Sequence, residues 1–122
     1  MAEFRAAVRR RDGAAIVDLH GQIDRAASGP LAAGYDQAAQ TPGAIVLNFE
    51  GVDYINSTGI ALIVGLLARA RAEHRVVGAC GLSDHYREIF EITRLSDFMG
   101  IYADEDSAAA APAATANTGR QS

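Results

Sequence analysis

The residues of this chain that could carry chemistry gather in one short segment, Asn56-Ser57-Thr58-Gly59. A serine hydroxyl can act as a nucleophile or accept a phosphoryl group, and Asn56 or Ser57 can cap a helix that starts here. A helix N-terminus offers free backbone N–H groups and the positive end of the helix dipole, so an added phosphate would be tolerated. The residues alone leave two interpretations open, a modifiable serine and a plain helix cap.

Catalytic and metal-binding alternatives find little support in the sequence. Ser57 and the three histidines could suggest a hydrolase, but Ile55 stands where a nucleophile elbow of the type Gly-x-Ser-x-Gly has its first glycine. The histidines, His20, His74 and His85, have no second ligand at metal-site spacing, and no phosphate-cradling loop of the type GxxxxGK[ST] is present. We therefore predict no catalytic residue, no metal and no cofactor. The single cysteine, Cys80, is expected to be a small buried apolar side chain.

Composition narrows the range of partners and compartments. A chain of 122 residues predicts one domain, and its net charge of −4 argues against nucleic-acid binding, which needs a basic face. The N-terminus lacks the apolar core of a signal peptide, and the longest apolar run, residues 60–68, is too short for a membrane span. We expect a cytoplasmic protein that does not bind a membrane. The sequence leaves the oligomeric state open.

Periodicity predicts an α/β fold with a mixed sheet. Residues 4–8 and 15–19 are predicted to form a hairpin around Arg11-Asp12-Gly13, because Asp-Gly favours tight turns. Asp24 is a predicted N-cap for a helix that begins near Pro30. The remaining elements are expected to be a buried strand at 44–49, a loop at 50–55, a helix at 60–73, a strand at 76–79 and a helix at 81–94.

The predicted core and the predicted tail divide the chain into two parts. On the second helix the core positions are expected to be Ile60, Ile63, Val64 and Leu67. Residues 1–102 form the predicted domain. Residues 103–122 have almost no large apolar side chains to bury, so they are predicted to be a disordered alanine-rich tail.

The stretch VLNFEGVDYINSTGIALIVGLLARAR resembles the central signature of the STAS-domain anti-sigma factor antagonists, small bacterial partner-switching proteins. In that family a buried strand leads to a loop with the sequence Asp-Ser-Ser/Thr-Gly and then to an apolar helix. Residues 56–59 occupy those four positions, with Asn56 in the acidic one. The segment 20–24 resembles an earlier Gly-Glu-Leu/Ile-Asp turn, and residues 81–83 and 89–93 resemble the final helix. The likeness covers residues 4–102 and implies about four to five strands and about four helices.

The resemblance implies a phosphorylation switch centred on Ser57. In the family this serine is phosphorylated by an anti-sigma factor that is itself an ATP-using serine kinase, and a PP2C-type phosphatase removes the phosphate. The unmodified antagonist binds the anti-sigma factor and releases sigma, whereas the phosphorylated form does not. The predicted partner-binding residues, from the motif positions and from the loop and helix beside them, are Ile23, Asp24, Asp53, Tyr54, Asn56, Ser57, Thr58, Gly59 and Leu62.

Several points stay open within this interpretation. Asn56 keeps the capping oxygen of the family's aspartate but lacks its charge, so docking could be weaker or differently tuned. Asp53 and Tyr54 could be interface or ordinary loop residues, and Leu62 could face outward or into the core. The alternative functions are a phosphorylation-independent scaffold or adaptor in a larger regulatory assembly, and a small-ligand sensor.

Overall fold

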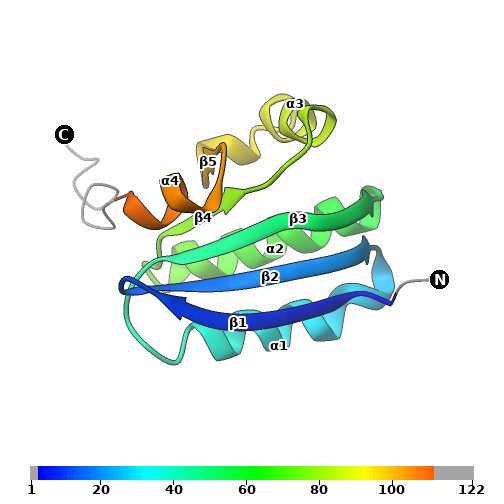
Figure 1. Cartoon of the computed structure of the whole chain (residues 1–122). Helices are drawn as coiled ribbons and strands as arrows, with labels where there is room; N and C mark the ends of the chain where they lie inside the picture. Colours follow the sequence, from blue (N-terminus) through cyan, green and yellow to red (C-terminus); the bar gives the residue numbers. More distant parts are fainter. Residues whose placement is uncertain (1–2, 112–122) are drawn as a thin grey trace.

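The computed structural model describes residues 3–111, which form a mixed five-stranded sheet with helices on both of its faces (Figure 1). The strands lie in sequence order, with β1 antiparallel to β2 and all later neighbours parallel. They are β1 (Arg5–Arg11), β2 (Ala14–Ile23), β3 (Ile45–Ile55), β4 (Val77–Cys80) and β5 (Gly100–Tyr102). The helices are α1 (Ser28–Ala38), α2 (Ser57–Ala72), α3 (Asp84–Ile92) and α4 (Glu105–Ala110), with 3-10 turns at Arg25–Ala27 and Leu95–Asp97. The predicted α/β fold with a mixed sheet is confirmed.

The first two strands form the predicted hairpin. Asp12 and Gly13 both have positive φ angles, 51° and 83°, as a two-residue type I′ turn requires. Pairing continues from Arg11 opposite Ala14 to Arg5 opposite His20, so both strands are longer than predicted. Asp and Gly at the turn thus fix the register of the sheet edge.

Strand β3 extends through the predicted loop at residues 50–55, so that prediction is wrong. The segment pairs in parallel with β2, with Gly51 opposite His20 and Ile55 opposite Ile23. Register shifts interrupt the ladder twice, and exposed polar residues such as Asp53 break the apolar pattern. Backbone pairing with β2, which is not visible in local composition, holds this part of the strand.

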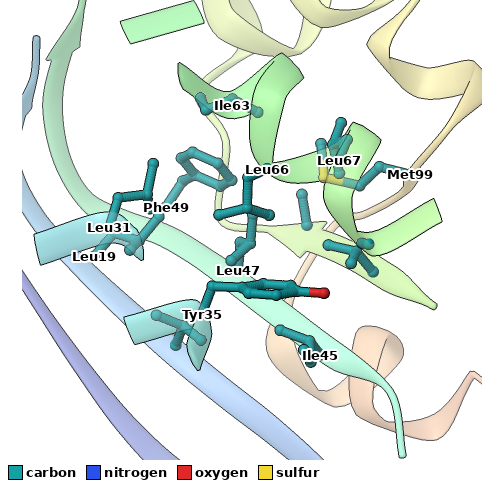
Figure 2. Close-up of a cluster of buried hydrophobic side chains, with 14 of the residues drawn as sticks. Leu19, Leu31, Tyr35, Ile45, Leu47, Phe49, Ile63, Leu66, Leu67 and Met99 are labelled. Carbon is teal, nitrogen blue, oxygen red and sulfur yellow. The ribbon is translucent and has the colours of Figure 1, made fainter. Parts of the chain in front are cut away.

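One face of the sheet carries the main apolar core beneath α1 and α2 (Figure 2). Phe90 of α3 joins this core, with its ring edge-on to Phe49 at 5.6 Å between centroids. The prediction that Val64 of α2 is a core residue is wrong, because its side chain is 46% exposed. Ile60, also predicted in the core, is only partly buried. The buried residues of α2 form a stripe beside the exposed side that carries Val64. They are Gly59, Ile63, Leu66, Leu67 and Ala70.

The short helix α4 covers part of the opposite face. Its buried residue Ala108 packs on Ala14, Ile16, Val46 and Cys80, which point away from the main core. The predicted domain end at residue 102 and the predicted disorder from residue 103 are therefore wrong for residues 103–111. Residues 112–122 lie outside the described part of the chain.

The predicted burial of Cys80 is confirmed. Its side chain is 1% exposed, beneath α4. Burial raises the pKa of the Cys80 thiol to about 11. The thiol therefore belongs to the packing under α4.

We expect α4 to lose its contribution to stability in acid. Arg9 and Arg11 hydrogen-bond the Glu105 carboxylate and lower its pKa to about 2. A depressed carboxylate pKa contributes stability above the unfolded-state pKa, and this contribution is lost as the pH falls toward the folded-state pKa. Urea unfolding should therefore show a steeper loss of unfolding free energy between about pH 5 and pH 2 for the wild type than for Glu105→Gln. Glu88→Gln, on the exposed side of α3, is the control. Equal slopes for the wild type and Glu105→Gln would contradict this account.

Candidate functional site

The site begins with a capped helix start. The Asn56 side-chain oxygen accepts a hydrogen bond from the Gly59 backbone N–H at 2.8 Å, which identifies Asn56 as the N-cap. The Ile60 backbone N–H donates to the Asn56 carbonyl at 2.9 Å, so the helical bonds are formed from the first turn. Helix α2 therefore starts at Ser57, three residues before the predicted start at Ile60.

Contacts from two other elements hold this start in place. The Asn56 N–H donates to the carbonyl of Ile23, the last residue of β2, at 3.2 Å. Gly59 packs against the same carbonyl, since a Cβ at this position would overlap its oxygen and lie 2.8 Å from its carbon. From the other side, the Tyr86 hydroxyl of α3 accepts a hydrogen bond from the Ile55 N–H at 2.9 Å. The turn between β3 and α2 is thus tied to both β2 and α3.

Ser57 is the first residue of α2, and its side chain is exposed, as is that of Thr58. The first N–H groups of a helix have no intrahelical acceptor, and they form the positive end of its dipole. The first turn of α2 contains no acidic side chain. A phosphate on Ser57 would therefore stand in water, at a helix end that favours negative charge.

A shallow hollow of about 500 Å³ lies beside the helix start. Its lining residues are Asp24, Arg25, Ala26, Asn56 and Thr58. The Asp24 carboxylate accepts from the Ala26 N–H at 2.9 Å, so Asp24 is an N-cap as predicted, although it caps the 3-10 turn that precedes α1. Arg25 and Ala26 were not predicted from the sequence to be site residues. Their position directly after the predicted cap Asp24 could have indicated that they lie beside the start of α2.

The other predicted partner-binding residues divide between surface and interior. Tyr54 is 51% exposed and Asp53 is also exposed, so both can meet a partner. Leu62 is partly buried against the core. Ile23 and Gly59 are buried, so the prediction that they contact a partner directly is wrong. Both residues act instead in the backbone contact that seats α2 on β2.

The remaining chemical candidates lie apart or carry no site. His74 follows the C-terminal end of α2, the opposite end from Ser57, and His20 and His85 are exposed. Within residues 3–111, histidine, cysteine and acidic side chains form no cluster of three or more that could hold a metal ion. None of the helices in the described part of the chain combines the length and apolarity needed to cross a membrane.

Comparison with known proteins identifies the family of this chain. Residues 5–108 match the profile of the STAS domain. The chain belongs to the STAS domain family. One relative is BtrV of Bordetella bronchiseptica, whose name describes an anti-sigma factor antagonist. It is 33% identical over 106 residues, which cover 84% of this chain and 87% of that protein.

Two further comparisons are more limited. An anti-sigma-B factor antagonist of Staphylococcus aureus is 39% identical over 57 residues, which are 47% of this chain and 53% of that protein. The match thus spans about half the length of the staphylococcal relative. The Bacillus cell fate determinant SpoIIAA, solved in its phosphorylated form, superposes with a TM-score of 0.63 at 20% identity, covering 86% of this chain and 96% of that one. At this identity the superposition establishes the fold alone.

The contact between Gly59 and Ile23 predicts contrasting effects of alanine at two glycines of α2. Gly59→Ala places a Cβ against the backbone of β2 and should lower the free energy of unfolding by about 2 kcal/mol. Gly65→Ala is the matched control, because nothing lies within 4 Å of its added Cβ. It should raise the unfolding free energy by up to about 1 kcal/mol, since alanine favours helix. Equal effects in urea unfolding would show that the close approach does not constrain the helix.

The cap predicts a second pair of variants. Asn56→Ala removes the oxygen that accepts from Gly59 N–H and should cost about 1 kcal/mol of unfolding free energy. Asn56→Asp keeps that oxygen and adds a charge next to the helix N-terminus, so its stability at neutral pH should equal or exceed that of the wild type. Thermal and urea unfolding measure both. A destabilised aspartate variant would argue that the site requires a neutral cap.

Proposed function

We propose that this protein is a cytoplasmic anti-sigma factor antagonist, a binding protein and not an enzyme, whose docking is switched by phosphorylation of Ser57. The observation that carries the proposal is the exposed hydroxyl of Ser57 at the capped and anchored start of α2. The names of the staphylococcal and Bordetella relatives support the antagonist role. The phosphorylated SpoIIAA structure supports a phosphate on this fold.

The proposed docking surface is formed by the exposed residues around Ser57. Tyr54 offers an aromatic side chain, Asp53 offers a charge, and Thr58 lies at the rim of the hollow. The outward side of α2 continues with Ala61 and Val64, both exposed. From Ser57 to Ala68 the helix contains no charged residue. A partner seated on this face would therefore enclose Ser57 in surroundings where new charge is costly.

The magnitude of the electrostatic effect is sufficient for a switch. Phosphorylation adds a charge of about −1.5 to −2. Repulsion between two like unit charges about 4 Å apart costs about 4 kcal/mol at an effective dielectric constant of about 20. A hundredfold loss of affinity needs only about 2.8 kcal/mol. Because α2 is anchored by backbone contacts, the modification can act at the interface without refolding the domain.

The proposed partners are an anti-sigma factor that is also a serine kinase and a PP2C-type phosphatase. The kinase would transfer the γ-phosphoryl group of ATP to the Ser57 oxygen, releasing ADP, and the phosphatase would hydrolyse the phosphoserine. Thr58 is exposed beside Ser57, so the position of the phosphate has to be established.

The binding test uses two substitutions of Ser57 and one control. Ser57→Asp places a negative charge at the interface and should weaken binding to the cognate anti-sigma factor at least about hundredfold, whereas Ser57→Ala should bind like the wild type. Thr58→Ala, one residue away in the same docking surface, adds no charge and should therefore weaken binding far less than Ser57→Asp. Isothermal titration calorimetry measures all three. Equal affinities for the aspartate and alanine variants would refute the switch.

Asn56 favours a second candidate function, a phosphorylation-independent STAS scaffold or adaptor. This position is acidic in the family's motif, and a neutral cap could accompany a partner that does not modify the serine. Incubation with the cognate kinase and ATP, followed by mass spectrometry, separates the two candidates. Phosphate on Ser57 in the wild type and in Thr58→Ala supports the switch. An unmodified Ser57 would favour the scaffold.

A further inference from the structure

The short helix α4 lies over β3, β4 and β5 on the outer face of the sheet, and its first turn meets arginine side chains of β1 (Figure 1). Arg9 and Arg11 stand two residues apart on β1 and therefore on the same side of the strand. Both donate to the Glu105 carboxylate, with Nη1 to Oε2 distances of 3.0 and 2.9 Å. Arg11 also binds Asp106 at 2.6 Å. Arg9 also donates from Nε and Nη2 to the Asp18 carboxylate of β2, so its guanidinium is shared between Asp18 and Glu105. The start of α4 is thus an acidic segment held by two arginines, one of which keeps a carboxylate partner on the sheet.

Little else in the described residues holds α4 in place. The helix has six residues, and Ala108 is its one buried side chain. The arginines are exposed by 46% and 35%, and ion pairs this open to water contribute little individually. Short segments with few buried contacts open locally at much lower cost than the sheet beneath them.

Opening of α4 would uncover a surface with a definite chemistry. Four of the seven residues of β1 are arginines, and Arg5 lies on the same side as Arg9 and Arg11. Next to them lies the apolar patch beneath Ala108, which consists of Ala14, Ile16, Val46 and Cys80. Arginine side chains bind carboxylates bidentately. Ala14 and Cys80 are small, and with Ile16 and Val46 they form an apolar surface on which a helix can pack. The face therefore suits an acidic helix with small apolar residues.

We propose that this outer face is a docking surface for an acidic helical segment of a protein partner, and that α4 is an internal occupant which the partner displaces. The chemistry of the partner is inferred from α4 itself, which presents Glu105 and Asp106 to the arginines and Ala108 to the patch. This surface lies on the opposite side of the sheet from α2, so its function does not depend on Ser57.

Cys80 reports directly on whether α4 covers the face. It is the one cysteine of the chain, and it lies in the patch under Ala108. In the full-length variant Glu105→Lys/Asp106→Lys, the arginines repel α4, and alkylation of Cys80 should be about tenfold faster than in the wild type. Arg69→Gln, which removes exposed ion pairs with Asp36 and Glu73 on the side of the sheet that carries α1 and α2, should leave the rate unchanged. Circular dichroism and urea unfolding establish that the sheet stays folded in each variant.

A capped peptide of residues 103–111 serves as the acidic probe. Added to the lysine variant, it should restore protection of Cys80. A neutral peptide with Glu105→Gln and Asp106→Asn should not do so, nor should the acidic peptide protect a variant that also carries Arg9→Gln and Arg11→Gln. An unchanged alkylation rate in the lysine variant, or no protection by the acidic peptide, would overturn the proposal. Equal protection by both peptides would also overturn it, as would concentration-dependent dimerisation in sedimentation, which would assign the face to a second copy of the chain.

Discussion

The contact between Gly59 and the Ile23 carbonyl is the constraint on which the rest of the site depends. Parallel pairing of β2 with β3 continues to Ile23 and Ile55, so the ends of the two strands lie side by side where α2 begins. Only a residue without a Cβ lets the first turn of α2 sit on that strand end. Asn56 then closes the turn with its side-chain cap, and Ser57, the next residue, faces water.

This arrangement gives the two faces of the sheet different physical roles. The face beneath α1 and α2 carries the main core and determines where α2 lies, so the position of Ser57 depends on buried packing. The opposite face is only partly covered, by a short helix held through arginine–carboxylate pairs. A chain with a net charge of −4 thus concentrates four of its eleven basic residues on one edge strand. In the described residues, α2 is thus held by the buried core, whereas α4 is held by exposed ion pairs and one buried alanine.

The sequence predicted the features that local chemistry determines. Asp12-Gly13 specified the hairpin, Asn56 was one of two predicted caps, and Cys80 was expected to be buried. The errors concern contacts between distant parts of the chain. Pairing with β2 extends β3 through a polar segment, and Arg9 and Arg11 hydrogen-bond Glu105 at the start of α4, more than ninety residues away in the sequence. Val64 followed helical spacing, but the orientation of α2 on the sheet could not be derived from spacing alone.

The central claim is that modification of Ser57 changes local charge on a helix whose position is already fixed. Nuclear magnetic resonance of the chain with phosphoserine incorporated at position 57 tests it most directly, against the unmodified chain. We expect amide shift changes confined to the start of α2, the neighbouring 3-10 turn at Arg25–Ala27 and the end of β3, with a free energy of unfolding equal to or above that of the unmodified chain. Shift changes throughout β1 and β2, or a marked loss of stability, would show that the phosphate refolds the domain and would contradict the account.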